Sequence, residues 1–236
     1  MKTTIFCCSD THGKAPPLPK KVDYFLHAGD FYDYLGQLRH GMSERDFAGL
    51  KNNKQILTEW KKNLSCPSFF VRGNHDVYDL HKIMSEDISG KLHRLSDGLV
   101  LVGIGWSGGV FCDLPLERDI IPICESLFDQ AAAEMKQGEH SIILTHYPPY
   151  IEQFYSSYGE GYDEGFVFKA VKKAMEAFRP VLLIQGHLHQ KNGITFTYDG
   201  TMIVHPGPVG MTIEIDEANV RIIAPQSELP GTHPQA

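Results

Sequence analysis

Residues 3–13 read Thr-Thr-Ile-Phe-Cys-Cys-Ser-Asp-Thr-His-Gly, an apolar run that ends in a polar cluster. Thr3–Cys8 has the length and the residue content of a buried β-strand, and Asp10 and His12 follow it directly. Both of these side chains can ligate a metal ion. The same combination of a short apolar run and a terminal polar cluster recurs along the chain, and this recurrence decides the fold.

Four further runs end in residues of the same chemical types. They are Val22–Ala28 before Gly29-Asp30, Ser68–Val71 before Gly73-Asn74-His75-Asp76, Ser141–Leu144 before Thr145-His146, and Val181–Ile184 before Gly186-His187-Leu188-His189. In α/β sheets, ligands gather outside the carboxyl ends of the strands. If the five runs lie side by side with the same orientation, their terminal side chains converge in one place.

Helices and further strands complete the pattern. Helices are predicted over Ser43–Leu64, Ile120–Lys136, where Pro122 obscures the start, and Glu164–Phe178, and strands over Leu99–Ile104 and within Ile194–Ile223. Strand and helix alternate in the early half, whereas the late half is mostly strand. We therefore expect an α/β (α+β) fold, a four-layer α-β-β-α sandwich of two mixed β-sheets flanked by helices.

Length and composition set the limits of the interpretation. The chain has 236 residues, of which 42% are hydrophobic, so it can bury one sizeable core. We expect a single domain over 1–224 and a flexible tail over 225–236, which carries proline, serine and glycine. The net charge of −7 disfavours a broad nucleic-acid-binding face, so nucleic acid is not expected as a partner.

The ends and the cysteines of the chain favour a cytoplasmic protein without a membrane anchor. Met1 leads straight into the first apolar run, with neither a signal-peptide core nor a segment long enough to span a bilayer. The five cysteines are odd in number and form no Cys-x-x-Cys pair, which disfavours a structural zinc site or a disulfide framework.

Seven side chains at the strand ends are candidate metal ligands, which are Asp10, His12, Asp30, Asn74, His146, His187 and His189. One metal ion needs only three or four protein ligands, so seven suffice for two ions if one carboxylate bridges them. Imidazole and carboxylate ligands suit Mn, Fe, Zn or Co. We expect two divalent ions, with Mn²⁺ favoured and Fe, Zn, Ni, Co or Mg as alternatives. Such a pair lowers the pKa of a bridging water and stabilises an in-line displacement at phosphorus.

Each cluster alone has an ordinary explanation. Gly29-Asp30 is typical of a turn, and His146 before Tyr147 could be a hydrogen-bonded core histidine. Gly73-Asn74-His75-Asp76 and the paired histidines His187 and His189 are more specific. The five clusters in this order are far less expected by chance than any one of them.

The ordered set resembles the signature of the calcineurin-like metallophosphoesterases. That signature is Asp-x-His, Gly-Asp, Gly-Asn-His-Asp/Glu, His and Gly-His-x-His, and every part of it occurs between residues 10 and 189. His205-Pro206-Gly207 also looks like the Asn-Pro-Gly turn found in bacterial members, with His205 in place of asparagine, and no role is assigned to His205.

The resemblance implies a role for each residue of the site. Asp10, His12 and His189 would hold one metal, Asn74, His146 and His187 the other, and Asp30 would bridge them. His75 would protonate the leaving alkoxide, and Asp76 would hydrogen-bond His75 and favour its charged form. A neighbouring carboxylate raises the pKa of an imidazole, which is the physical basis of that last role.

We therefore expect a dinuclear-metal-dependent phosphoester hydrolase in which a metal-bridging hydroxide attacks a small phosphodiester. A phosphomonoesterase and a nuclease use the same chemistry and remain alternatives, and a metal-bound scaffold without activity is an alternative of another class. Aromatic residues follow two of the clusters and could stack on a substrate ring or simply pack the loops. They are Phe31, Tyr32, Tyr34, Tyr147, Tyr150, Phe154, Tyr155, Tyr158 and Tyr162.

Overall fold

The computed structural model describes residues 2–32, 44–76, 86–105, 116–151 and 165–225. The strands are β1 (Lys2–Cys8), β2 (Tyr24–His27), β3 (Ser68–Phe70), β4 (Lys91–Ser96), β5 (Leu99–Ile104), β6 (His140–Thr145), β7 (Leu182–Ile184), β8 (Ile194–Tyr198), β9 (Thr201–His205), β10 (Met211–Asp216) and β11 (Asn219–Pro225). The helices are α1 (Glu44–Asn63), α2 (Leu116–Glu134), α4 (Gly165–Phe178) and the 3-10 turn η3 (His189–Lys191). In the described part of the chain, no helix has the length and apolar character needed to cross a membrane.

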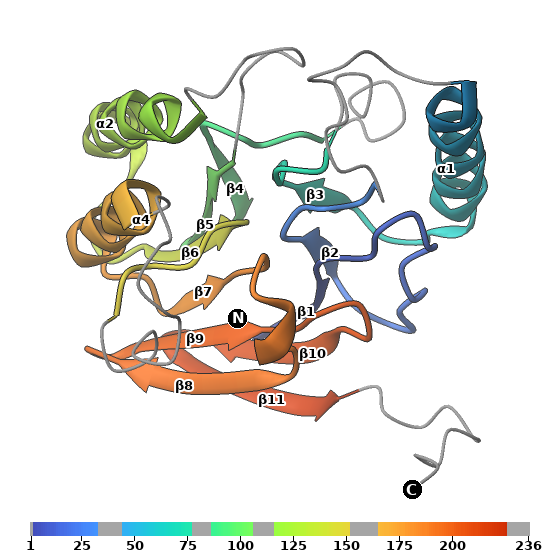
Figure 1. Cartoon of the computed structure of the whole chain (residues 1–236). Helices are drawn as coiled ribbons and strands as arrows, with labels where there is room; N and C mark the ends of the chain where they lie inside the picture. Colours follow the sequence, from blue (N-terminus) through green and yellow to red (C-terminus); the bar gives the residue numbers. More distant parts are fainter. Residues whose placement is uncertain (1, 33–43, 77–85, 106–115, 152–164, 226–236) are drawn as a thin grey trace, which may run out of the picture.

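The described strands form two mixed sheets that face each other. One sheet has the order β11-β10-β1-β2-β3 and the other β4-β5-β6-β7-β9-β8. Strands β1, β2 and β3 run parallel, as do β5, β6, β7 and β9, while the remaining strands pair antiparallel at the margins. Helix α1 lies beside β2 and β3, and α2 and α4 lie on the opposite side of the molecule, outside the second sheet (Figure 1). The predicted α-β-β-α sandwich is confirmed.

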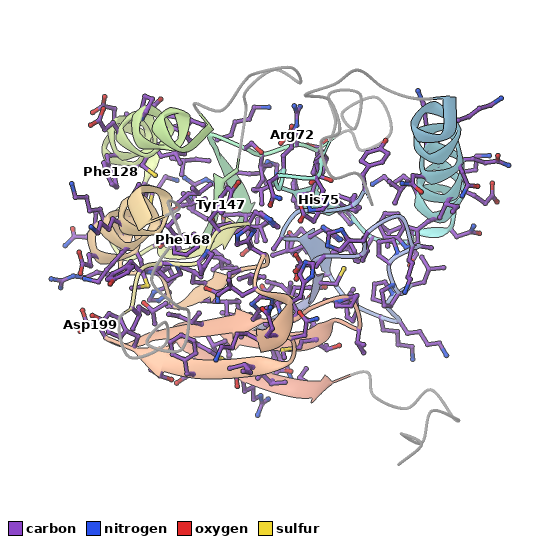
Figure 2. All side chains as sticks on the ribbon, in the orientation of Figure 1. Arg72, His75, Phe128, Tyr147, Phe168 and Asp199 are labelled. Carbon is purple, nitrogen blue, oxygen red and sulfur yellow. The ribbon has the colours of Figure 1, made fainter. Side chains whose placement is uncertain are left out.

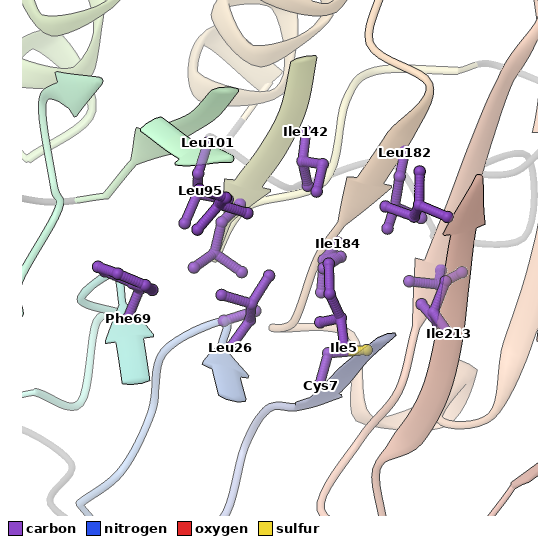
Figure 3. Packing of buried hydrophobic residues seen from close by; sticks show 14 of the residues in the cluster. Ile5, Cys7, Leu26, Phe69, Leu95, Leu101, Ile142, Leu182, Ile184 and Ile213 are labelled. Carbon is purple, nitrogen blue, oxygen red and sulfur yellow. The ribbon is translucent and has the colours of Figure 1, made fainter. Parts of the chain in front are cut away.

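Three apolar clusters separate the four layers, and the period-2 geometry of the strands distributes residues among them. Along β1, Ile5 and Cys7 enter the cluster between the sheets, whereas Phe6 enters the cluster that contains Leu57 and Trp60 of α1. Figure 3 shows the layer between the sheets, to which strands of both contribute. Each fully buried aliphatic or aromatic side chain contributes about 1.5–3 kcal/mol, so these layers hold the strand ends in fixed positions.

The second sheet alternates in the same way. Leu182 and Ile184 of β7 face the first sheet, while Leu183 packs in the cluster that holds Val171 and Met175 of α4. These strands are buried on both faces, which explains why they are nearly continuous apolar runs in the sequence.

Some boundaries differ from those predicted. Helix α2 begins at Leu116, four residues earlier than expected, and contains Pro122. Pro122 is exposed, so its ring and its missing N–H perturb the helix at its surface. Strand β4 was not predicted. Its sequence Lys-Leu-His-Arg-Leu-Ser is polar, and Leu95 is its one buried residue. Strand β11 still includes Pro225, the first residue of the expected tail, and 226–236 lies outside the described residues. The single domain over 1–224 stays a prediction.

Candidate metal centre

The candidate site lies where the carboxyl ends of parallel strands from both sheets meet. Asp10 and His12 follow β1, and Asp30 follows β2. His189 opens η3 just after β7. One ligand atom from each of these four residues lies within 4.8 Å of the others, so the first cluster of the sequence meets the last.

A second group of ligands lies beside the first. The Oδ1 atom of Asn74 lies 2.9 Å from Nε2 of His146 and 3.1 Å from Nδ1 of His187. Asp30 lies between the two groups, because its Oδ2 atom is 3.4 Å from Nε2 of His146 and 3.9 Å from Nε2 of His12. The structure thus brings together all seven residues that the sequence singled out as ligands.

The hydrogen bonds of the imidazoles leave lone pairs directed into the site. Nδ1 of His146 lies 2.8 Å from the carbonyl oxygen of Ala28, and Nδ1 of His12 lies 3.2 Å from that of Tyr32. A carbonyl oxygen only accepts, so each Nδ1 carries the proton and each Nε2 is left as a base. A metal-ligating histidine typically bonds a backbone carbonyl through its second nitrogen in this way.

This tautomer makes the contact between His146 and Asn74 a test of the metal hypothesis. Burial and the nearby His187 lower the pKa of His146 to about 4, so its ring is neutral near pH 7. Its Nε2 lone pair then faces the Asn74 oxygen at 2.9 Å, which places two acceptors together without a proton. A cation between them would satisfy both atoms, so the donor set fits a metal ion.

The two carboxylates of the site supply negative charge. Burial, and then the charge of Asp10, raise the pKa of Asp30 to about 7. For Asp10, burial works against ionisation, but the nearby imidazoles of His189 and His205 outweigh it and hold the pKa below its usual range. Divalent cations would relieve the repulsion between the two carboxylates, because each cation attracts both.

The backbone is held in a rare conformation at four of the seven ligands. Asp10, His12, Asp30 and His187 have φ values of 54°, 43°, 59° and 73°. Residues other than glycine seldom adopt this left-handed region, and strain of this kind concentrates at functional sites. The surrounding layers must hold these turns in place.

Gly73 is required because the strand ends approach so closely. A Cβ atom at this position would overlap Oδ1 of Asp30 and lie only 2.8 Å from Cε1 of His146. We expect Gly73→Ala to displace Asp30 or His146, to destabilise the fold by about 1–3 kcal/mol and to weaken metal binding. Thermal unfolding and Mn²⁺ titration measure both effects.

Gly49 in α1 provides the matched control for that substitution. Nothing lies within 4 Å of a Cβ atom placed there, so Gly49→Ala should leave stability unchanged or raise it. Equal behaviour of the two variants would show that the close approach at Gly73 does not constrain the site.

His75 also lies in the site, but its predicted partner is elsewhere. Its Nε2 atom lies 3.9 Å from Oδ2 of Asp30, and its ring packs edge-on to His12 with centroids 4.6 Å apart. Nδ1 is buried without a hydrogen-bond partner among the described residues. Burial, and then neighbouring histidines such as His12, lower the pKa of His75 to about 4. Figure 2 labels His75 beside the ends of β2 and β3.

The expectation that Asp76 hydrogen-bonds His75 is therefore wrong. The carboxylate of Asp76 instead accepts backbone N–H groups from Asp30 and Gly73, each at 2.8 Å, and from Phe31 at 2.7 Å. Successive side chains of a loop point in different directions, so adjacency in the sequence did not imply contact. Asp76 thus fixes the Asp30 loop against the Gly73 loop.

The aromatic residues near the site divide into two groups. Phe31 and Tyr32 are buried in the cluster under α1, so these two pack their loop onto the body. Tyr147 and Phe168 flank His187, with ring centroids 5.0 and 6.2 Å from its imidazole. Figure 2 labels these two aromatic residues. Tyr34 and most of the aromatic segment after Tyr150 lie outside the described residues.

The sequence assigned no role to His205, yet this residue reaches the site. It is the last residue of β9, and its Nε2 atom lies 3.6 Å from Oδ2 of Asp10. The signal was present, because Thr201–His205 is another apolar run that ends in a histidine. No role was assigned because His205 stands where the Asn-Pro-Gly turn of bacterial members has asparagine.

Comparisons with known proteins agree with this arrangement. The family model of the calcineurin-like phosphoesterases matches residues 3–191, which include every candidate ligand. A search of curated proteins found no significant match.

Two solved structures show the same fold at low sequence identity. The phosphopantetheinyl hydrolase PptH of Mycobacterium tuberculosis has a TM-score of 0.57 at 13% identity, with 86% of this chain and 88% of that one covered. A protein of Staphylococcus aureus provisionally assigned as a 5′-nucleotidase also has a TM-score of 0.57 at 13% identity, and 94% of this chain covers 53% of it. The fold, the order of the motifs and the family match over most of the chain lead to one conclusion: this protein belongs to the calcineurin-like phosphoesterase family.

Proposed function

We propose that this protein is a dinuclear-metal-dependent hydrolase of a small phosphodiester. Asp10, His12 and His189 would hold one divalent ion, and Asn74, His146 and His187 the other, with Mn²⁺ as the favoured metal. The observation that carries the proposal is the position of Asp30, whose Oδ2 atom lies 3.4 Å from Nε2 of His146 in one group and 3.9 Å from Nε2 of His12 in the other. A carboxylate at that position is suited to bridge two ions.

The two metal ions would provide the chemistry that the side chains lack. When bound, two divalent ions supply a hydroxide nucleophile near neutral pH and stabilise the charge of an in-line displacement at phosphorus. The two carboxylates, Asp10 and Asp30, would offset only part of the charge of two divalent ions, so the remaining positive charge would attract the phosphate. Asn74 ligates through an amide oxygen, so it adds no negative charge that would repel the incoming phosphate.

His75 is the group best placed to assist the leaving oxygen. Its backbone N–H donates to Oδ1 of Asp30 at 2.9 Å, and this bond fixes the ring beside the bridging carboxylate. A neutral imidazole still carries one N–H to donate, and the negative charge of a bound phosphate favours its protonation. This assignment does not need Asp76, which is engaged with the backbone.

A diester is favoured over a monoester because the guanidinium that precedes the Gly73 loop is already engaged. Arg72 precedes the Gly73 loop, and its Nε donates to Oδ2 of Asp87 at 2.7 Å. Both side chains of this pair are largely buried. A dianionic monoester would gain more from an unengaged guanidinium than a monoanionic diester does.

Hydrolysis of bis-p-nitrophenyl phosphate and of p-nitrophenyl phosphate, with and without Mn²⁺, tests the proposal. We expect turnover only with metal, and a higher kcat/KM for the diester. A His93→Ala variant is the control, because His93 packs on Phe69 in β3, with ring centroids 4.2 Å apart, and takes no part in the site. Absence of turnover of both esters with every divalent metal tried would overturn the proposed function, whereas a preference for the monoester would overturn only the substrate class.

A further inference from the structure

His205 and Asp10 form a buried pair behind the candidate metal centre. Both side chains are 1% exposed, and Nε2 of His205 lies 3.6 Å from Oδ2 of Asp10. Neither ring nitrogen of His205 has a hydrogen-bond partner among the described residues, and neither does Oδ2 of Asp10. Two buried polar groups that face each other at this distance can satisfy each other.

The two oxygens of Asp10 face different surroundings. Oδ1 accepts the backbone N–H of His187 at 2.9 Å and lies 3.4 Å from Nε2 of His189, so it faces the other ligands. Oδ2 faces His205 instead. A carboxylate that must present one chosen oxygen to a metal needs a group that fixes the other.

The surroundings of Oδ2 are polar rather than apolar. Ser9 and Gln185 are buried, and their side-chain polar atoms lack partners among the residues that the structure describes. Backbone hydrogen bonds bring the segments together, since Ser9 N–H donates to Gly207 and Gln185 N–H donates to Val204. A histidine that merely filled space would be surrounded by hydrocarbon, as Leu183 is in the adjacent strand.

We propose that His205 is a positioning residue for metal binding: it donates Nε2–H to Oδ2 of Asp10 and so holds Oδ1 toward the first metal. A small adjustment of either side chain brings the 3.6 Å separation to hydrogen-bond length. The role concerns the first metal, because Oδ1 of Asp10 lies 3.4 Å from Nε2 of His189, the other end of that metal's ligand group. The inference rests on the proposed function, in which Asp10 is a metal ligand.

Two substitutions separate hydrogen bonding from packing. His205→Phe keeps a ring of similar size but removes the donor, whereas His205→Gln keeps an N–H donor without the ring. We expect His205→Phe to weaken binding of one of two Mn²⁺ ions by roughly 10–100-fold, and His205→Gln to restore most of the affinity. Calorimetric Mn²⁺ titration measures the two classes of site, and anomalous diffraction at limiting Mn²⁺ shows which one is depleted.

The outcomes distinguish this inference from the proposed function. Failure of the parent chain to bind two ions would refute the proposed function, and the inference with it. Parent-like binding by His205→Phe, equal weakening in both variants, or loss of the ion held by His146 and His187 would each refute the positioning role alone. His93→Ala should bind like the parent. If His205→Phe does not fold, His205→Leu makes the same comparison without added bulk.

Discussion

Asp30→Asn is expected to lose metal from both positions together. Asp30 lies between the two ligand groups, and the substitution removes the negative charge that would attract both ions. Changes to residues that only support metal ligands already weaken binding by roughly 10–100-fold, so loss of a bridging carboxylate should weaken it by at least about 100-fold. Elemental analysis after dialysis against limiting Mn²⁺ should find both ions depleted, and diester hydrolysis should fall with them.

The metal-free variant should remain folded, which makes the result interpretable. An amide oxygen can still accept the His75 N–H that Oδ1 of Asp30 accepts. Burial raises the pKa of Asp30 to about 7, so the ionised form costs stability increasingly as pH rises from the unfolded pKa to that value. At pH 8 the neutral amide avoids this cost, so the metal-free variant should unfold at or above the unfolding temperature of the metal-free parent. Retention of one full equivalent of metal would argue against a bridging Asp30.

His75→Ala is expected to have the opposite signature, with both metals retained and turnover lost. The His75 ring packs edge-on to His12 and lies 3.9 Å from Oδ2 of Asp30. The backbone N–H that donates to Asp30 remains in alanine. Positioned proton donors contribute about 10²–10⁴-fold to catalysis, so kcat on a diester with a poor leaving group should fall by that factor. Metal content and kcat, determined on the same preparation, check the prediction.

The leaving group provides an internal control for His75. An activated phenolate needs little protonation, whereas an alkoxide needs much, so the variant should lose less activity on bis-p-nitrophenyl phosphate than on an alkyl diester. An equal loss on both substrates would show that His75 does not act on the leaving oxygen. Unchanged activity on both would remove His75 from the mechanism.

The sequence predicted the layers and the residues that gather at the strand ends, because both depend on short-range patterns. Runs such as Leu182–Ile184 are apolar at every position because both faces of the strand are covered. The polar residues that follow such runs therefore lie at the edge where the strand ends meet. The polar strand Lys91–Ser96 could not be recognised in this way, because it lies at a sheet margin with Leu95 as its one buried residue.

Contacts between side chains could not be predicted as well as the strands. Asp76 precedes no strand and follows His75 directly, and nothing local indicates that its oxygens accept N–H groups from Asp30 and Phe31, about 45 residues away in the chain. His205 ends β9 in one sheet, and Asp10 follows β1 in the other, so the two residues meet only because the sheets pack against each other. Such pairings depend on how two sheets pack, which no local pattern specifies.

The left-handed turns at Asp10, His12, Asp30 and His187 set a limit on engineering this protein for heat resistance. Glycine would relax each turn, and a screen that rewards only a higher melting temperature would favour it at these positions. Each such substitution would remove a candidate ligand, so a gain in stability at any of these four residues would come with a loss of metal binding.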